Sequence, residues 1–458
     1  MAVFARSVSF QESREELARW HLRSTALLRL VPPWSGVRVV TLPDELVDGA
    51  LAELDVPVPP FRRVIWRSRI VDVSEKGFAD LQEKGPFKSW HHEHRFLEKP
   101  GETSRLEDHV RFELKEPWPL NRLGQRVVES GLIRTFSWRH VRTGNDLRRH
   151  HENDWRSATV LVTGSSGLVG QALCAFLQTG GCDVRRLVRR SPDRDKGEYA
   201  WDPARGEIDR SSLQGVDAVV HLAGAGIADK RWTEARKELI RSSRVDSTRL
   251  LAGAIADMGS DAPALIAASA IGYYGDRPDE EVDESASPGE GFLSRTCVEW
   301  EGAADAARAA GARVVNLRIG VVVAGGGGAV ARLRRPVLMG VAGPLGNGRQ
   351  GMSWIALDDL LAIIHQSIHD ERFDGPINAV VQRPIDNRAF IKSMGGVLRR
   401  PTIAPMPAFV ARMLFGQMGE EALLQGAFVL PRRLEDLGFR YDFPELDDAL
   451  RFELGLLS

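Results

Sequence analysis

The chain has 458 residues, of which 27% are charged, and its formal net charge is −1 at pH 7. A chain of this length typically forms two or three domains, and a nearly neutral charge excludes a large basic surface for nucleic acid. The three cysteines lack the spacing of a metal or redox motif, and no apolar run approaches the ~18 residues that cross a membrane. Because a signal-peptide core is also absent, we expect a cytoplasmic protein that binds neither nucleic acid nor membrane.

Composition changes near residue 157. Seven of the eleven tryptophans precede this position, whereas all three cysteines, Cys174, Cys182 and Cys297, follow it. The charged stretch at residues 145–156 (NDLRRHHENDWR) lies between the two parts. We therefore expect a first domain over residues 1–150 and the rest of the folded chain from residue 157 on.

The first domain has the pattern of an antiparallel sheet with a long closing helix. Residues 3–10 alternate as a strand, and residues 13–22 predict a short helix. The sequence RLVPPW at residues 29–34 predicts a turn, because neither proline can continue a helix. A closing helix is predicted at residues 123–139, after strand-like runs at residues 37–41, 62–73, 78–81, 89–97 and 104–114.

This domain resembles the START-like ligand-binding superfamily. The resemblance rests on the order of elements and on RLVPPW, GPFKSWHHEHRF (85–96), the strand that contains Asp108 and FSWRH (136–140). It implies an α+β helix-grip fold, in which a sheet curls around a long helix and often encloses an apolar cavity. We therefore expect that the domain either holds an apolar ligand or uses its tryptophans to fill a core.

Three histidines in this domain raise the question of a metal site. On a strand, His92 and His94 share one face with Trp90, whereas His91 points the other way with Glu93. No second cluster of ligands is evident in the sequence. We therefore expect ordinary sheet histidines and no metal.

The second part of the chain opens with a strand, a glycine-rich turn and a helix. Residues 160–162 predict a buried strand, Gly164, Gly167 and Gly170 form a G-x-x-G-x-x-G set, and residues 184–188 predict the next strand. A phosphate can approach the backbone of such a turn, and the N–H groups of the helix start can hold it. We expect a dinucleotide to bind at Thr163, Gly164, Ser165, Ser166, Gly167, Leu168 and Gly170.

The end of the second strand discriminates between the two nicotinamide dinucleotides. NAD sites usually place an acidic residue there, but this position holds Arg189 and Arg190, and Asp183 lies at the other end of the strand. A guanidinium pairs well with a 2′-phosphate, so the sequence favours NADP over NAD. The alternative is a pair of solvated arginines.

Strands and helices then alternate. The stretch GVDAVVHLAG (215–224) predicts a strand whose small terminal residues Leu222, Ala223 and Gly224 let the adenosine side of the cofactor pass close to the backbone. The alternation predicts an α/β doubly wound parallel sheet, a Rossmann domain over residues 157–400, with a small helical cap at 401–458. Its further elements are expected at residues 231–255, 264–275, 297–309 and 313–323.

This part resembles the extended short-chain dehydrogenases/reductases. More narrowly, it is similar to the atypical branch described as NAD-dependent epimerase/dehydratase and, in places, as cell division inhibitor. The matching stretches are TGSSGLVG, HLAG, SAIGYYG, LRIGVV, GPLGNGRQGMSWIALDDL and LPRRLEDLGFRYDFPELDDAL. The resemblance implies a nicotinamide cofactor and a small-molecule substrate.

The proton relay of that family is missing. The relay is a Tyr-x-x-x-Lys motif, and none of the four tyrosines here is followed by lysine at that spacing; Leu293 and Cys297 occupy the two positions. We consider as catalytic candidates Ser269, which also lies against the cofactor, with Tyr273, Tyr274 and Lys230. Arg231, Lys237 and Cys297 are further candidates, and packing or solvation is the alternative for each.

Three functions remain open. The chain is expected to be an NADP-dependent reductase or epimerase acting on an unknown small molecule, such as a nucleotide sugar. The alternatives are an NADP-binding sensor without turnover and a cell-division-related interaction protein with a ligand-binding START-like module. Arg318, Arg349 and Gln350 are candidate substrate contacts. The oligomeric state is left open, and a homodimer is one of the alternatives.

Overall fold

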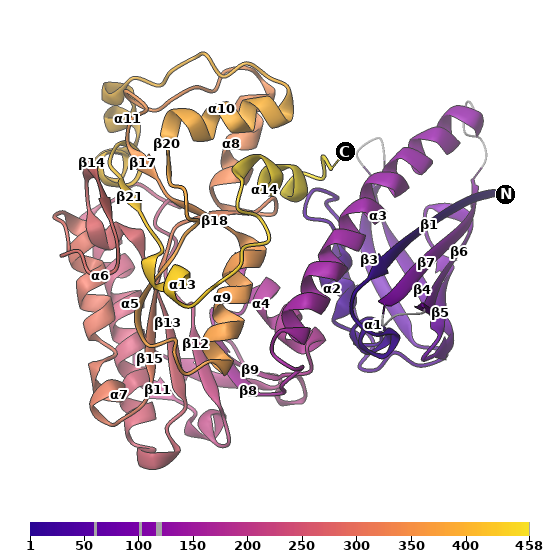
Figure 1. Ribbon diagram of the computed structural model, residues 1–458, viewed down its shortest axis with the longest axis horizontal. Coiled ribbons are helices and arrows are strands. Elements are labelled where there is room, and N and C mark those ends of the chain that lie inside the picture. The colour runs from indigo at the N-terminus through magenta and orange to yellow at the C-terminus, as the bar shows by residue number, and fades with distance from the viewer. Residues whose placement is uncertain (59–61, 100–102, 116–120, 458) are drawn as a thin grey trace. The chain divides into compact units, whose positions relative to one another are not determined.

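The computed structural model describes residues 1–58, 62–99, 103–115 and 121–457 (Figure 1). Its internal contacts divide the chain into two compact units. The first unit comprises Met1–Arg156, Ala175–Gly181 and Phe452–Ser458, and the second comprises Ser157–Cys174 and Cys182–Arg451.

The first unit is built on a seven-stranded sheet in the order β1-β7-β6-β5-β4-β3-β2, antiparallel throughout. Helices α1 (Arg14–His21) and α2 (Ala26–Leu30) follow the first strand, and the long helix α3 (Asn121–His151) follows the last. The strands are β1 (Ala2–Phe10), β2 (Arg38–Thr41), β3 (Leu51–Val58), β4 (Arg62–Ser74), β5 (Gly77–Lys84), β6 (Phe87–Lys99) and β7 (Thr103–Leu114). This order matches the predicted order of elements apart from α2 and β3, which were not predicted, while the START-like assignment itself stays a prediction.

Local sequence explains most of these elements. Helix α1 begins at a capping box, in which the Ser13 hydroxyl accepts from the backbone N–H of Glu16 and the Glu16 carboxylate accepts from that of Ser13. Along β6, Trp90, His92 and His94 are buried and alternate with more exposed residues, as predicted. Strand β3 was not predicted; its Pro57 lies beyond the part that pairs with β2, where a proline is tolerated.

The charged stretch at residues 145–156 is largely helical. The two units divide after Arg156, but α3 continues to His151. Within the last turns of α3, Asp146 is buried and its Oδ1 lies 2.6 Å from Nη2 of Arg29. A charged run at a boundary can therefore contain a core ion pair.

The second unit is built on an eight-stranded sheet in the order β11-β10-β9-β8-β12-β13-β15-β19. All its strands run parallel except β11, so the predicted doubly wound Rossmann sheet is confirmed. Its strands are β8 (Thr159–Thr163), β9 (Asp183–Val188), β10 (Glu198–Asp202), β11 (Glu207–Ile208), β12 (Ala218–His221), β13 (Ala264–Ala270), β15 (Val314–Ile319) and β19 (Gly375–Ala379).

Helices cover both faces of this sheet (Figure 1). Helices α5 (Glu234–Ala256), α6 (Phe292–Gly302) and α7 (Asp305–Ala309) lie on one side, and α4 (Leu168–Thr179) and α9 (Leu357–His369) lie on the other. The strand order reverses between β8 and β12, and ligands of such sheets bind at the carboxyl ends of the strands beside this point.

Short sheets connect distant parts of the second unit. Strand β14 (Arg277–Val282) pairs with β21 (Ala427–Val429), β16 (Val321–Val323) with β18 (Trp354–Ala356), and β17 (Gly351–Met352) with β20 (Ile385–Asp386). A separate cap at residues 401–458 stays a prediction, because β21 belongs to one of these sheets. The remaining helices are α8 (Gly328–Leu338), α10 (Asn387–Leu398), α11 (Ala408–Phe415), α12 (Gln417–Gly419), α13 (Arg432–Asp436) and α14 (Leu446–Glu453).

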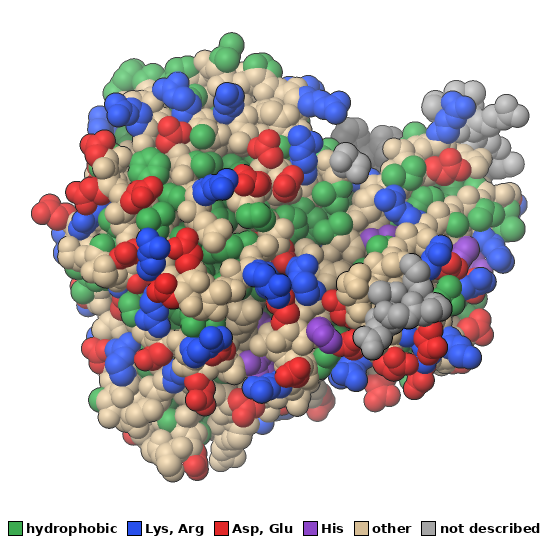
Figure 2. Space-filling view, viewed as in Figure 1, with side chains coloured by type: hydrophobic (Ala, Val, Ile, Leu, Met, Phe, Trp, Pro, Cys, Tyr) green, Lys and Arg blue, Asp and Glu red, His purple; other side chains and the backbone are tan. Residues whose placement is uncertain are grey.

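The surface carries charges of both signs. On the face that Figure 2 shows, Lys and Arg side chains are interspersed with Asp and Glu, without a broad area of one sign. Among the residues described, no helix combines the length and apolar character needed to cross a membrane.

Candidate functional site

The predicted dinucleotide turn lies between β8 and α4. Gly164 has φ +69°, and a Cβ there would lie 2.8 Å from the backbone carbonyl of Leu222 and 2.9 Å from the amide nitrogen of Ala223. A Cβ on Gly170 would lie 2.2 Å from the carbonyl oxygen of Gly164. These two glycines are therefore required by close packing of the turn against the end of β12 and against the helix start.

Polar groups fix the base of the turn. The buried Thr163 hydroxyl lies 2.6 Å from Nδ1 of His221 and accepts from the backbone N–H of Ala223 at 3.3 Å. Burial lowers the pKa of His221 to about 3, so this imidazole is neutral at pH 7. Above the base, Ser166 and Gly167 are exposed, which leaves the outer backbone of the turn open to a ligand.

The two arginines after β9 lie in different surroundings. Arg190 is paired with Glu198: its Nη1 donates to Oε2 at 2.7 Å. Arg189 is exposed, and it makes no hydrogen bond or ion pair with the part of the chain that the structure describes. Of the two arginines predicted to bind a 2′-phosphate, Arg189 is the one whose guanidinium is available.

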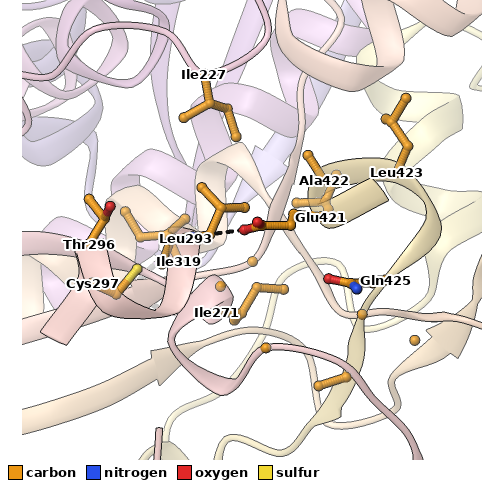
Figure 3. A pocket seen from close by; sticks show the side chains of 18 of the residues that line it. Ile227, Ile271, Leu293, Thr296, Cys297, Ile319, Glu421, Ala422, Leu423 and Gln425 are labelled. Atoms are coloured by element: carbon orange, nitrogen blue, oxygen red, sulfur yellow. Dashed lines mark hydrogen bonds between the residues drawn. The ribbon is translucent and has the colours of Figure 1, made fainter. Parts of the chain in front are cut away.

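A cavity of about 460 Å³ opens in the second unit beside this sheet (Figure 3). Ser269 near the end of β13 and Ile319 at the end of β15 line it, so it lies at the carboxyl edge of the strands, where ligands of this fold bind. Apolar side chains form most of the wall, among them Ile227, Ile240, Ile271, Leu293, Leu345, Met352 and Leu423.

Three ionisable residues that line the cavity were not predicted, namely Arg244, Glu290 and Glu421. Glu421, from a π-helical turn (Glu420–Leu424), directs its carboxylate toward α6 (Figure 3) and accepts from the backbone N–H of Leu293 at 3.0 Å. Arg244 of α5 donates to the carbonyl oxygens of Ala225 and Ile240, and burial lowers its pKa. A signal for Arg244 existed, because it follows Ile240 by one turn on the buried stripe of α5, whereas nothing in the sequence singles out Glu421.

The predicted catalytic residues do not converge in this cavity. Ser269 lines it, but its hydroxyl donates to Glu301 at 2.7 Å, and Glu301 is paired with the buried Arg318. Tyr274 is fully buried; it donates to Asn378 at 2.7 Å and accepts from Arg318 at 2.9 Å. Burial raises the pKa of this tyrosine to about 12.

The other candidates lie around this network or at the surface. The guanidinium carbon of Arg318 lies 3.5 Å from the ring centroid of Tyr273, and neither tyrosine is among the described residues that line the cavity. Lys230, Arg231 and Arg349 are exposed. Lys237 contacts Gln417, whereas Gln350 lines the cavity and donates to the carbonyl oxygen of Leu423.

The surroundings of Cys297 explain why its thiol is unreactive. Cys297 lines the cavity and is 4% exposed. Burial raises the pKa of its thiol to about 12, so the reactive thiolate is scarce at neutral pH. Cys297 therefore acts as a small apolar wall residue.

Comparison with known proteins identifies the family. Residues 160–379 match the NAD dependent epimerase/dehydratase family, and residues 406–453 match a domain of unknown function, DUF1731. The chain is 41% identical over 296 residues to the epimerase family protein Mb2239 of Mycobacterium bovis, covering 97% of that protein and 65% of this chain. It is 35% identical over 297 residues to the human epimerase family protein SDR39U1, covering 98% of that protein and 64% of this chain.

Solved structures agree with this assignment. A crystal structure described as the nucleoside-diphosphate sugar epimerase from Corynebacterium glutamicum matches 99% of this chain and 90% of its own, with a TM-score of 0.82 and 31% identity. The structure of human SDR39U1 (isoform 2) with NADPH matches 65% of this chain and 100% of its own, with a TM-score of 0.58 and 32% identity. The protein belongs to the NAD dependent epimerase/dehydratase family, together with the SDR39U1-like epimerase family proteins.

Proposed function

We propose that the second unit binds NADP(H) and catalyses a reductase or epimerase reaction on a small molecule held in the 460 Å³ cavity. The observation that carries the proposal is the glycine turn beside an exposed Arg189 that has no partner among the described residues. A free guanidinium there suits a 2′-phosphate, and the exposed turn suits the pyrophosphate. The similar human SDR39U1 was solved with NADPH, which supports the same cofactor here.

The substrate side of the proposal rests on Arg244. Its guanidinium is held by two carbonyl oxygens in an apolar cavity, and no described carboxylate pairs with it. A partly buried cation without an anionic partner favours a ligand that brings a phosphate or carboxylate. A nucleotide-sugar-like substrate has that chemistry, and the related Corynebacterium glutamicum protein is described as a nucleoside-diphosphate sugar epimerase.

Titration with NADPH and NADH, followed by intrinsic fluorescence, tests the cofactor. We expect Arg189→Ala to weaken NADPH binding at least tenfold, or by about 1.4 kcal/mol, and to leave NADH binding unchanged. Arg190→Ala is the matched control, because that guanidinium is already paired with Glu198. Equal NADPH affinity in wild type and Arg189→Ala would contradict the NADP preference. If neither dinucleotide bound, the interaction-protein hypothesis would become the favoured one.

Glu421 is the proton-transfer group in this proposal. Its carboxylate accepts from the N–H of Leu293, the residue at the position of the missing tyrosine, and from the side chain of Gln417 at 2.7 Å. A carboxylate held in this way can accept a proton from a substrate hydroxyl or carbon. The carboxylate also lines the cavity, whereas Ser269 and Tyr274 are engaged elsewhere.

Turnover assays with wild type and Glu421→Gln test this role. Carbonyl compounds are screened by the oxidation of NADPH. Nucleoside-diphosphate sugars are screened by their conversion into an epimer. We expect Glu421→Gln to lower kcat by at least about a hundredfold and to leave NADPH affinity within twofold. Glu420→Gln is the control, since Glu420 pairs with Arg412 instead; an equal loss in that variant would contradict the assignment.

NADP(H) binding without turnover is the second candidate. It is favoured by the hydrogen bonds that engage the Ser269 and Tyr274 hydroxyls. Tight NADPH binding without turnover of any compound in the screen would select it.

A further inference from the structure

The first unit contains a second cavity, of about 280 Å³. Its wall is largely apolar and includes Leu30, Leu54, Ile70 and Phe136, but Asp80, His92 and His94 also line it. Sheet register brings these polar residues together, because Asp80 pairs directly with His92 across β5 and β6, and His94 pairs with Asp108 across β6 and β7. Directly paired residues share one face of a sheet, so all four side chains lie on the same side.

The side chains of this cluster make close contacts. Nδ1 of His92 lies 3.0 Å from Oδ2 of Asp80, and its Nε2 lies 3.1 Å from Oδ1 of Asp108. Nδ1 of His94 lies 2.9 Å from the same Asp108 oxygen, and Nε2 of His140 lies 2.7 Å from the other one. Three imidazoles therefore surround one buried carboxylate, while Asp80 approaches His92 from the opposite side.

We propose that Asp80, His92 and His94 bind a divalent transition-metal ion, with zinc as the favoured ion. One ligand atom from each residue lies within 4.8 Å of those from the other two. Zinc binds imidazole nitrogen and carboxylate oxygen at about 2.0–2.2 Å, which separates neighbouring ligands by roughly 3.3 Å. The 3.0 Å between His92 and Asp80 is close to that separation, and the ion replaces the proton that these two atoms share.

Asp108 supports the proposed ion from outside its ligand shell. It accepts from Nε2 of His92, which leaves Nδ1, the nitrogen that faces Asp80, to bind the ion once its proton is displaced. A carboxylate behind a metal-binding histidine is the usual way in which a protein fixes the ring and its tautomer. The hydrogen bond with His140 holds Asp108 in place.

His94 provides an independent sign that the cluster lacks a partner. Its side chain is 9% exposed, and its buried Nδ1 lies 2.9 Å from Oδ1 of Asp108 without a hydrogen bond to it. Buried polar atoms are rarely left in this state unless an ion, water or ligand completes their surroundings. This finding separates His94 from the ordinary sheet histidine expected from the sequence.

Charge and access also fit an ion. Asp108 is buried and Asp80 is partly buried, so two nearby carboxylates balance the charge of a bound dication. Three protein ligands leave a coordination position open, as in catalytic rather than structural zinc sites. Because the three ligands line the cavity, its occupant is an apolar molecule with an oxygen donor, such as a carboxylate or phenolate.

Metal uptake by the full chain tests the proposal. The protein is prepared without a histidine tag, stripped with a chelator and titrated with Zn²⁺ by calorimetry and with Co²⁺ by visible absorption. We expect about one equivalent to bind and His94→Ala to weaken binding at least about a hundredfold. His91→Ala is the matched control, because His91 lies one residue away on the other face of β6 and is expected to bind normally.

A second variant covers the case in which His94→Ala does not fold. Asp80→Asn keeps the oxygen that accepts from Ser68 and Trp90 but removes the charge and the Oδ2 ligand. Its thermal unfolding is expected to match wild type without metal, and it is expected to lose the stabilisation that Zn²⁺ gives wild type. No uptake by wild type, or equal uptake by wild type, His94→Ala and Asp80→Asn, would overturn the proposal.

Discussion

The two cavities described above assemble their charged groups in different ways. In the first unit, Asp80, His92 and His94 come from neighbouring strands and meet through direct cross-strand pairing. In the second unit, Arg244 and Glu421 come from elements far apart in the chain. Groups that meet through sheet register can be placed once strand pairing is known, whereas the second arrangement depends on the complete fold.

The two units also differ in how deeply their ion pairs are buried. Arg29 and Asp146 in the first unit are 4% and 2% exposed, and Arg318 and Glu301 in the second are 4% and 13% exposed. We expect Asp146→Ala to lower the free energy of unfolding by about 3–5 kcal/mol, because it removes the carboxylate that a buried guanidinium faces. Glu301→Ala is expected to cost less, since water reaches that carboxylate.

Urea unfolding measures both changes, and hydrogen exchange assigns each loss to its unit. Glu113→Ala is the control, because its pair with Lys88 is exposed and is expected to contribute less than about 1 kcal/mol. A loss in Asp146→Ala as small as that of the control would remove the contrast between the units.

The second prediction uses His221 at the base of the glycine turn. The pKa of His221 is about 3 in the folded chain, well below the 6.5 of a free histidine. Between these two pH values the unfolded chain binds a proton at this residue and the folded chain does not. The stability from this group is complete above pH 6.5 and falls by up to about 1.4 kcal/mol per unit as pH drops toward 3. His221→Gln is expected to flatten this slope, so that urea midpoints of the variant and wild type converge between pH 7 and pH 5.

A parallel decline in both proteins would mean that other groups cause the acid sensitivity. The same buried position explains why the slope is steep: the imidazole contacts the hydroxyls of Thr163 and Ser247, and neither supplies a negative charge.

The smallest effect is expected at Cys297. Because its thiol is buried and its pKa is raised to about 12, we expect no alkylation of the folded protein by iodoacetamide at pH 8. Mass spectrometry of folded and denatured protein measures the difference, and Cys297→Ser is expected to change NADPH affinity less than twofold. Rapid modification of the folded chain would return Cys297 to the list of reactive groups.

The sequence predicted the parts of this fold that depend on local pattern. The glycine turn and the parallel strands followed from spacing and apolar runs, as did the facing of His92 and His94 on β6. Strand β3 was missed, although its Pro57 pairs only with β4, an edge-like position that accepts proline.

The chemistry of the second-unit cavity depended on long-range partners. Ser269 and Tyr274 are reasonable candidates by residue type, but Glu301 and Asn378 engage their hydroxyls from 32 and 104 residues away. Glu421 reaches Leu293 across 128 residues. Such pairings leave no trace in the spacing of one sequence, so the composition of the cavity could not be predicted from it.

The separation of Leu293 and Glu421 along the chain also affects the order in which the cavity wall is synthesised. During synthesis the glycine turn leaves the ribosome long before residues 421–427, most of which line the cavity and which include the start of β21. The nascent chain can therefore present its dinucleotide turn while the substrate pocket is still open on one side. The cavity wall is therefore complete only after the segment that carries Glu421 to Ala427 has been synthesised.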